Sequence, residues 1–234
     1  MAGFTTWPLD GFKQVYLVLV SLQNYEQVLI SNDFYLEITG WMKMHTFKVG
    51  YLVGSLANGS INRLLSKALV KLAPQQLTLT EISFKDLPLY SYDYDADFPP
   101  AARAFKQALA EVDAVLFITP EYNRSIPGAL KNAIDWASRP YKQNSFTHKP
   151  SAVIGTSPGM LGTAIAQLHL RSLLSYCNSP QMNVPEAYIQ FKKGLITEDG
   201  EVTVESTAKF LKFFMDEFHQ FIERVYIILP LDNE

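Results

Sequence analysis

The sequence predicts an α/β protein built on a doubly wound sheet of five parallel strands, with helices on both faces. From Phe47 onward, short apolar runs alternate with longer amphipathic runs, an order that gives right-handed βαβ units. The strand candidates are apolar on both faces, most clearly in Ala114–Thr119 (AVLFIT). Strands of this kind belong in parallel sheets that are covered on both sides.

The expected elements alternate strictly along the chain. The predicted strands are Phe47–Val53, Leu77–Ile82, Ala114–Thr119, Ala152–Gly155 and Tyr188–Ile189. The predicted helices, in which apolar residues recur at helical spacing, are Ile61–Leu72, Ala101–Glu111, Gly128–Ser138, Leu161–Leu174 and Glu205–Arg224. Five strands are the count of the flavodoxin-like fold, whereas a full dinucleotide-binding Rossmann fold has six.

Composition limits the classes of function. The chain has 234 residues, a formal net charge of −3 and 48% hydrophobic residues, enough for one sizeable core. Its near-neutral charge gives no reason to expect a nucleic acid or a membrane surface as partner. The apolar run Val15–Val20 is shorter than the ~20 residues of a membrane span. The single cysteine, Cys177, is expected to be buried and fits a reducing, cytoplasmic compartment.

The two ends of the chain do not follow the strand–helix pattern. Residues 1–41 are expected to be an N-terminal extension or variable leader, because Met42 and Met44 stand just before the first strand. The alternative is an extra strand over Val15–Val20 on the edge of the sheet. Residues 42–225 are expected to form the folded domain, and 226–234 a C-terminal tail.

The loop after the first strand carries the first functional signal. It runs GSLANGSIN from Gly54 to Asn62 and opens a helix, whose free N–H groups favour an anion. The hydroxyls of Ser55 and Ser60 add neutral donors. A P-loop lysine and the G-x-G-x-x-G fingerprint are both missing, so Glu81, after the second strand, reads as a surface carboxylate. The alternative for Ser60 is simple capping of the helix.

The loop after the third strand carries the second signal. Polar and aromatic residues follow directly after the apolar strand Ala114–Thr119, so they are not part of the core. Among them, Tyr122 offers a flat face to a heterocycle. Asn123 and the backbone can bond ring heteroatoms, and Pro120 and Pro127 stiffen the loop. A helix-entry loop capped by Ser125 is the alternative, and both readings can hold together.

Together, GSLANGSIN and TPEYNRSIPGALKNAIDWASRP resemble the NAD(P)H-dependent FMN reductase family, in its quinone and chromate reductase branch, over about Phe47 to Arg224. The resemblance implies that the FMN phosphate is held by Ser55, Ser60, Ile61 and Asn62. It implies that the isoalloxazine is lined by Pro120, Glu121, Tyr122 and Asn123, with Ser157, Pro158 and Gly159 approaching from the other side. The family often has a basic residue where Ala57 stands, and a glycine and an arginine where Thr163 and Ala164 stand.

The same resemblance implies NADPH or NADH as electron donor and a small acceptor such as a quinone, free flavin, an azo compound or chromate. It also implies a homodimer or homotetramer. No catalytic side chain is expected, because the flavin carries the chemistry. No metal site is expected either, since the four histidines have no ligand spacing and Asp93, Asp95 and Asp97 do not complete a calcium loop. A flavodoxin-like electron carrier is the alternative function.

Overall fold

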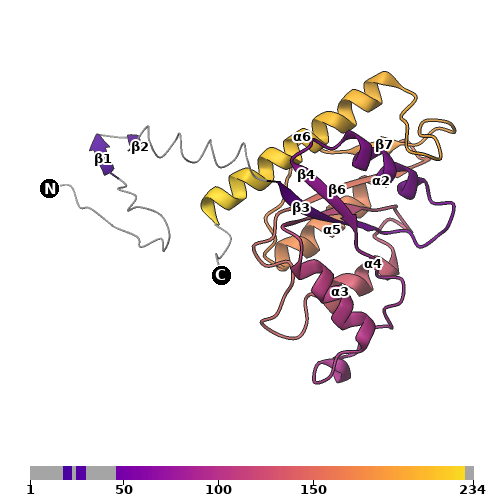
Figure 1. Cartoon of the computed structure of the whole chain (residues 1–234), viewed down its shortest axis with the longest axis horizontal. Coiled ribbons are helices and arrows are strands. Elements are labelled where there is room, and N and C mark those ends of the chain that lie inside the picture. The colour runs from indigo at the N-terminus through magenta and orange to yellow at the C-terminus, as the bar shows by residue number, and fades with distance from the viewer. Residues whose placement is uncertain (1–17, 23–24, 30–45, 230–234) are drawn as a thin grey trace. The chain divides into compact units, whose positions relative to one another are not determined.

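The computed structural model describes residues 18–22, 25–29 and 46–229 (Figure 1). The chain divides into two units, Met1–His45 and Thr46–Glu234. In the first unit, β1 (Val18–Leu22) pairs antiparallel with β2 (Tyr25–Leu29). The strand considered over Val15–Val20 therefore overlaps β1, whose hydrogen-bonded partner among the described residues is β2. Met42 and Met44 lie outside these residues, and the domain boundary at 42 stays a prediction.

The second unit contains the predicted sheet, with all neighbouring strands parallel (Figure 1). The strand order is β4-β3-β5-β6-β7, which is the flavodoxin-like order. The strands are β3 (Phe47–Val53), β4 (Leu77–Glu81), β5 (Ala114–Ile118), β6 (Ser151–Ser157) and β7 (Tyr188–Gln190). The predicted fold class is confirmed.

The helices begin and end close to the expected positions. They are α2 (Ile61–Leu72), α3 (Pro100–Ala110), α4 (Gly128–Ala137), α5 (Ala164–Tyr176) and α6 (Glu205–Ile228), with a short 3-10 turn at Tyr92–Tyr94. Helix α6 continues beyond the expected end at Arg224. Tyr226, assigned to the tail, is buried, stacks on Phe47 and donates its hydroxyl to the Asp113 carbonyl at 2.5 Å. The expected boundary after residue 225 therefore falls inside a packed helix.

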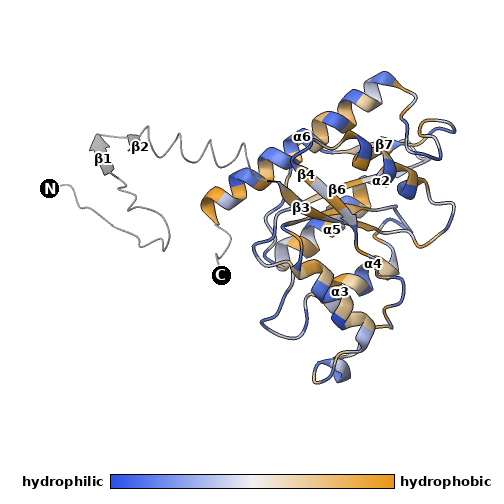
Figure 2. Ribbon diagram, viewed as in Figure 1, coloured by the Kyte–Doolittle hydropathy of each residue, from blue (hydrophilic) through white to orange (hydrophobic). Residues whose placement is uncertain are grey.

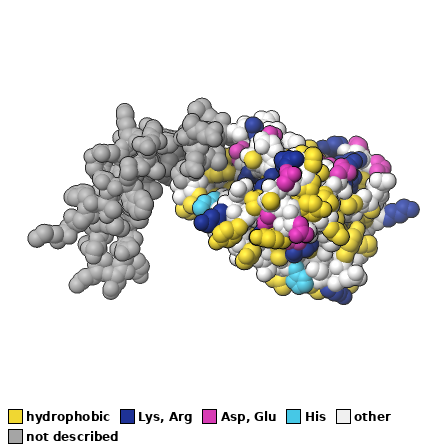
Figure 3. All heavy atoms as spheres, turned by 90° about the horizontal axis from the view of Figure 1, so that it is seen from below, with side chains coloured by type: hydrophobic (Ala, Val, Ile, Leu, Met, Phe, Trp, Pro, Cys, Tyr) yellow, Lys and Arg dark blue, Asp and Glu magenta, His cyan; other side chains and the backbone are white. Residues whose placement is uncertain are grey.

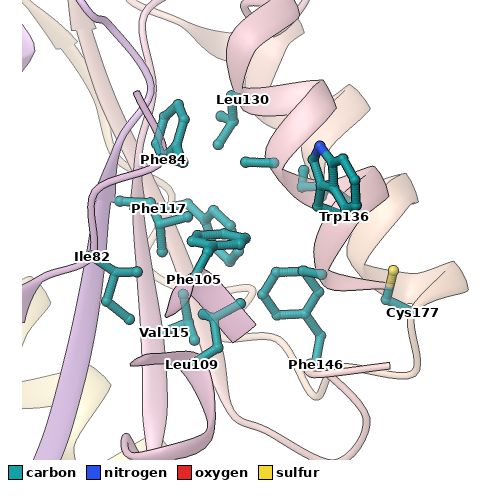
Figure 4. Close-up of a cluster of buried hydrophobic side chains, with 14 of the residues drawn as sticks. Ile82, Phe84, Phe105, Leu109, Val115, Phe117, Leu130, Trp136, Phe146 and Cys177 are labelled. Atoms are coloured by element: carbon teal, nitrogen blue, oxygen red, sulfur yellow. The ribbon is translucent and has the colours of Figure 1, made fainter. Parts of the chain in front are cut away.

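The core lies between the sheet and its helices. One buried cluster takes side chains from α3, α4 and α5 and from the sheet, with Phe105, Trp136 and Phe146 around Phe117 (Figure 4). Cys177 belongs to this cluster, as expected, and burial raises the pKa of its thiol. Figure 2 shows apolar strands and helices whose polar side faces outward. Each large side chain buried in this way contributes about 1.5–3 kcal/mol.

The surface is mixed. Figure 3 shows lysine and arginine interspersed with aspartate and glutamate on one face, without a field of a single sign. In the part of the chain that the structure describes, no helix is both long and apolar enough to cross a membrane. The charge on that face therefore gives no sign of a polyanionic partner.

Gly155, near the carboxyl end of β6, allows a close approach between two strand ends. A Cβ built on Gly155 would lie 2.1 Å from the Thr119 carbonyl oxygen and 2.3 Å from Thr163 Oγ1. The first of these atoms is backbone and cannot swing away. Any side chain at this position would therefore push β6 away from the end of β5.

We expect Gly155→Ala to lower the free energy of unfolding by about 1–3 kcal/mol, the usual cost of overpacking a tight interior. Gly128→Ala is the matched control, because a Cβ there meets nothing within 4 Å. The free energy of unfolding of the control should lie within about 1 kcal/mol of the parent's, since alanine restricts the unfolded chain and favours a helix. Urea unfolding followed by circular dichroism measures both. Equal stability of the two variants would contradict the close approach.

Candidate active site

Three loops meet at the carboxyl edge of the sheet, where parallel α/β proteins bind ligands. From β3 the chain passes to β4 on one side and later returns to β5 on the other, so the topological switch point lies between β3 and β5. The loops after β3, β5 and β6 are the three that the sequence singled out. The structure thus brings the predicted site residues to one edge of the sheet.

The loop after β3 leaves donors without acceptors. Ser60 is the N-cap residue of α2, but its side chain makes no capping hydrogen bond, so the capping alternative is not what the structure shows. The N–H groups of Ile61 and Asn62 fall in the first turn, where a helix offers no acceptor, and no other described residue supplies one. Ser55 Oγ is buried and accepts the Ala57 N–H at 3.4 Å. The loop is suited to an anion held by neutral donors.

The side chain of Asn62 is used for hydrogen bonds within the protein. Its side chain is 1% exposed and bonds both polar groups of one peptide position: Nδ2 donates to the Thr156 carbonyl at 2.9 Å, and Oδ1 accepts the Thr156 N–H at 3.0 Å. The pair ties the start of α2 to the end of β6. The Asn62 side chain therefore positions the loop, and its backbone N–H remains without an acceptor among the described residues.

The loop after β5 is a tight turn that presents Tyr122. Tyr122 and Ser125 exchange two backbone hydrogen bonds, of 2.9 and 3.0 Å, around Asn123 and Arg124. These two central residues have φ of 52° and 61°, the left-handed pair that a type I′ turn requires. The Tyr122 side chain is 48% exposed, and its hydroxyl lies 3.2 Å from Ser55 Oγ. This contact joins the two predicted motifs.

Glu121 acts on the neighbouring helix. Its Oε2 accepts the N–H groups of Ile165 and Ala166, both at 3.1 Å, in the first turn of α5. A carboxylate is stabilised there by the free N–H groups and the helix dipole. Ser125 Oγ also lies 3.1 Å from His169 Nδ1 on the same helix. The carboxylate of Glu121 fixes the turn against α5, and its expected place beside the flavin ring stays a prediction.

The loop after β6 is held by a hydrogen bond between its own residues, and its tip is exposed to solvent. Ser157 Oγ donates to the Gly162 carbonyl, and Gln190 Nε2 donates to the Pro158 carbonyl at 3.2 Å. Gly162 has a φ of 57°, which delays the start of α5 beyond the expected Leu161. Pro158 and Gly159 are exposed, and no described residue accepts the Gly159 N–H. Ser157 therefore shapes the turn, while Gly159 is free to meet a ligand.

Helix α4 holds the long loop after β4. Asn132 Nδ2 and Trp136 Nε1 both donate to the Pro88 carbonyl, at 2.9 and 2.8 Å. Arg139, just after the end of α4, pairs with Asp95 of the same loop at 2.5 Å. The KNAIDW run therefore fastens this loop beside the site. Sequence spacing gave no sign of these contacts, because they join residues more than forty positions apart.

Comparison with known proteins bears directly on these loops. A family model described as NADPH-dependent FMN reductase matches residues 47–194. The chain belongs to that family. A 2-hydroxy-1,4-benzoquinone reductase from Burkholderia sp is 50% identical over 171 residues, 73% of this chain and 93% of that protein. A quinone reductase from Pseudomonas putida is 43% identical over 178 residues, 76% of this chain and 95% of that protein.

A solved structure of similar fold and sequence is also a flavoenzyme. FerB, a flavoenzyme NAD(P)H:(acceptor) oxidoreductase from Paracoccus denitrificans, is 49% identical, with a TM-score of 0.74 over 76% of this chain and 98% of that chain. As an FMN reductase, the chain uses FMN and a reduced nicotinamide. The free hydroxyl of Ser60 and the free N–H groups of Ile61 and Asn62 fit a phosphate, and the exposed ring of Tyr122 fits a flat heterocycle. The residues present therefore suit the cofactor.

A carboxylate at Ser60 should expel the FMN phosphate from this loop. Two unit charges about 4 Å apart near a protein surface repel by about 4 kcal/mol, so Ser60→Glu should weaken FMN binding by on the order of 100-fold or more. Ser206→Glu, in the exposed first turn of α6, adds the same charge elsewhere and should bind FMN as the parent does. Flavin fluorescence titration of the two apoproteins measures this. Unchanged affinity in Ser60→Glu would mean that the phosphate binds elsewhere.

Proposed function

We propose that this FMN reductase works in the cytoplasm as a quinone reductase, passing electrons from NADPH or NADH to small acceptors, quinones first among them. The observation that carries the proposal is the Ser55–Tyr122 contact of 3.2 Å, which sets an open aromatic face beside a loop suited to a phosphate. The names of the two relatives at 50% and 43% identity support the choice of acceptor. The buried, unpaired Cys177 supports a reducing compartment.

Bound FMN supplies the electron-transfer chemistry. The part of this chain is to hold and expose the cofactor. Ser60 and the N–H groups of Ile61 and Asn62 bind the phosphate, while Pro120, Tyr122 and Asn123 line the ring. The free N–H of Gly159 would be the donor that stabilises negative charge on the bound ring. No side chain needs to give or take a proton at the hydride step, so no catalytic residue is named.

Donor and acceptor should bind in turn. If both stack over the one ring face left open near Tyr122, they cannot be bound together. Initial rates with NADPH and a quinone should then give parallel double-reciprocal lines, the pattern of two half-reactions. Anaerobic NADPH should remove the visible flavin absorbance, and a quinone should restore it.

Two outcomes would contradict this scheme. Intersecting lines would mean that donor and acceptor occupy the site together, which requires a second open face. A flavin that neither NADPH nor NADH can bleach would favour the electron-carrier function instead. Tyr122→Phe keeps the ring and removes the hydroxyl bonded to Ser55, so it should keep the parallel pattern.

We also propose a homodimer or homotetramer formed through α5. Leu168 and Tyr176, eight residues apart on this helix and so on one face, are 67% and 90% exposed. Met160 and Leu161, in the loop that leads into α5, are 88% and 56% exposed. Apolar exposure of this extent is typical of surfaces that meet another chain. The face continues from the site, so a second copy there would help to close it.

A charge on this face should prevent assembly. Leu168→Glu combined with Tyr176→Glu should reduce the mass measured by light scattering to that of one chain. Val70→Glu places the same charge at an exposed apolar residue of α2, 41% exposed, and should leave the mass unchanged. A parent protein that is already monomeric, or a double variant that still assembles, would contradict the proposed interface.

A further inference from the structure

A cavity of about 300 Å³ opens between the ends of β3 and β4. Its polar and charged lining comes from Asn58, Arg63, Glu81, Ser83 and Lys85. None of the residues assigned to the FMN phosphate or ring lines this cavity. It shares Leu56, Ala57 and Asn58 with the loop after β3, which is the loop proposed to hold the FMN phosphate.

The cavity carries net positive charge. Arg63 and Lys85 contribute two cations, and Glu81 contributes one carboxylate. Arg63 uses a single nitrogen, Nη1, to reach both Glu81 oxygens, each at 2.9 Å. Its Nε and Nη2 have no acceptor among the described residues, and Lys85 has no ion pair among them. Glu81 is thus neutralised, while further donors remain for a second anion.

The position of Glu81 indicates which kind of anion. Glu81 ends β4, the second strand of the first βαβ unit. In dinucleotide-binding folds an acid at this position bonds the ribose 2′-hydroxyl, and a nearby arginine accommodates a 2′-phosphate. Here both carboxylate oxygens of Glu81 already accept hydrogen bonds from Arg63. The pair therefore suits a 2′-phosphate, which needs a cation, better than a 2′-hydroxyl, which needs a free carboxylate.

The size and the remaining lining agree with a nucleoside. Pockets for small ligands begin at roughly 300 Å³, so this cavity can take one nucleoside-sized group but not a whole dinucleotide. Leu56 is 50% exposed and offers an apolar surface to a base. Ala57 leaves open the space that a larger side chain would fill, and the positive charge comes instead from Arg63 and Lys85.

We propose that this cavity binds the adenosine 2′-phosphate end of NADPH, and that Arg63 and Lys85 make the enzyme prefer NADPH to NADH. The inference rests on the proposed function, because it concerns the donor of that reaction. The FMN phosphate occupies the α2 N-terminus, so the donor reaches the cavity around the outside of the loop at Leu56–Asn58.

Calorimetric titration of the FMN-loaded enzyme with adenosine 2′,5′-bisphosphate tests this directly. The bisphosphate should bind at least 10-fold more tightly than adenosine 5′-monophosphate. Arg63→Gln combined with Lys85→Gln should weaken the bisphosphate by about 10- to 100-fold, as expected for the loss of charge-assisted contacts. The ratio of KM for NADPH to KM for NADH should rise by a similar factor. Glu81→Gln should act in the opposite direction, because it frees Arg63 and removes the negative charge.

Arg103→Gln is the matched control, because Arg103 also pairs with a carboxylate, Asp97, but does not line the cavity. It should behave as the parent in every measurement. Equal bisphosphate affinity in the parent and the double variant would overturn the proposal, and so would displacement of FMN by the bisphosphate. Quinone reduction by dithionite-reduced enzyme bypasses the donor site. If the parent enzyme fails this reaction, the proposed function is wrong. If the parent reduces quinone but binds the bisphosphate no more tightly than adenosine 5′-monophosphate, only the proposal for the cavity is wrong.

Discussion

The buried pair of hydrogen bonds between the Asn62 side chain and the Thr156 backbone is the constraint on which the site depends. It joins residues 94 positions apart, and it fixes the start of α2 against the end of β6. Without it, the Thr156 N–H and carbonyl would be buried without partners, at about 1–3 kcal/mol each. Gly155 beside it allows the strand ends to approach. The loops after β3 and β5 are therefore held at one fixed separation.

The other loops are fixed in the same way, by side chains that reach across the sheet edge. Glu121 binds the first turn of α5. Asn132 and Trp136 of α4, with Arg139 just after that helix, hold the loop after β4. A reductase whose chemistry belongs to its cofactor needs rigid placement more than reactive groups. The polar residues of its motifs are accordingly used for hydrogen bonds within the protein as much as for contact with ligands.

The sequence predicted the fold well because its signals are local. Five apolar runs that alternate with five amphipathic ones predict a parallel sheet covered on both faces, and Phe47–Val53 and Ile61–Leu72 have the expected bounds. The site loops were also predictable, since each follows a strand. The roles of Asn62, Glu121 and Arg139 were not, because their partners lie at least 44 residues away. Whether a polar side chain in a loop bonds to the protein or to a ligand depends on tertiary contacts, and the spacing of residues in the sequence does not show these contacts.

The two proposed anion sites share one loop, the loop after β3, but use different chemistry. On the α2 side, neutral donors and a helix start suit a phosphate that stays bound, because they need no cation that must be desolvated. On the β4 side, Arg63 and Lys85 stand in a cavity that remains open to water. Charge exposed to solvent contributes modestly to affinity and is screened by salt. A site of that kind suits a donor that must bind, react and leave, while the first site retains the cofactor throughout.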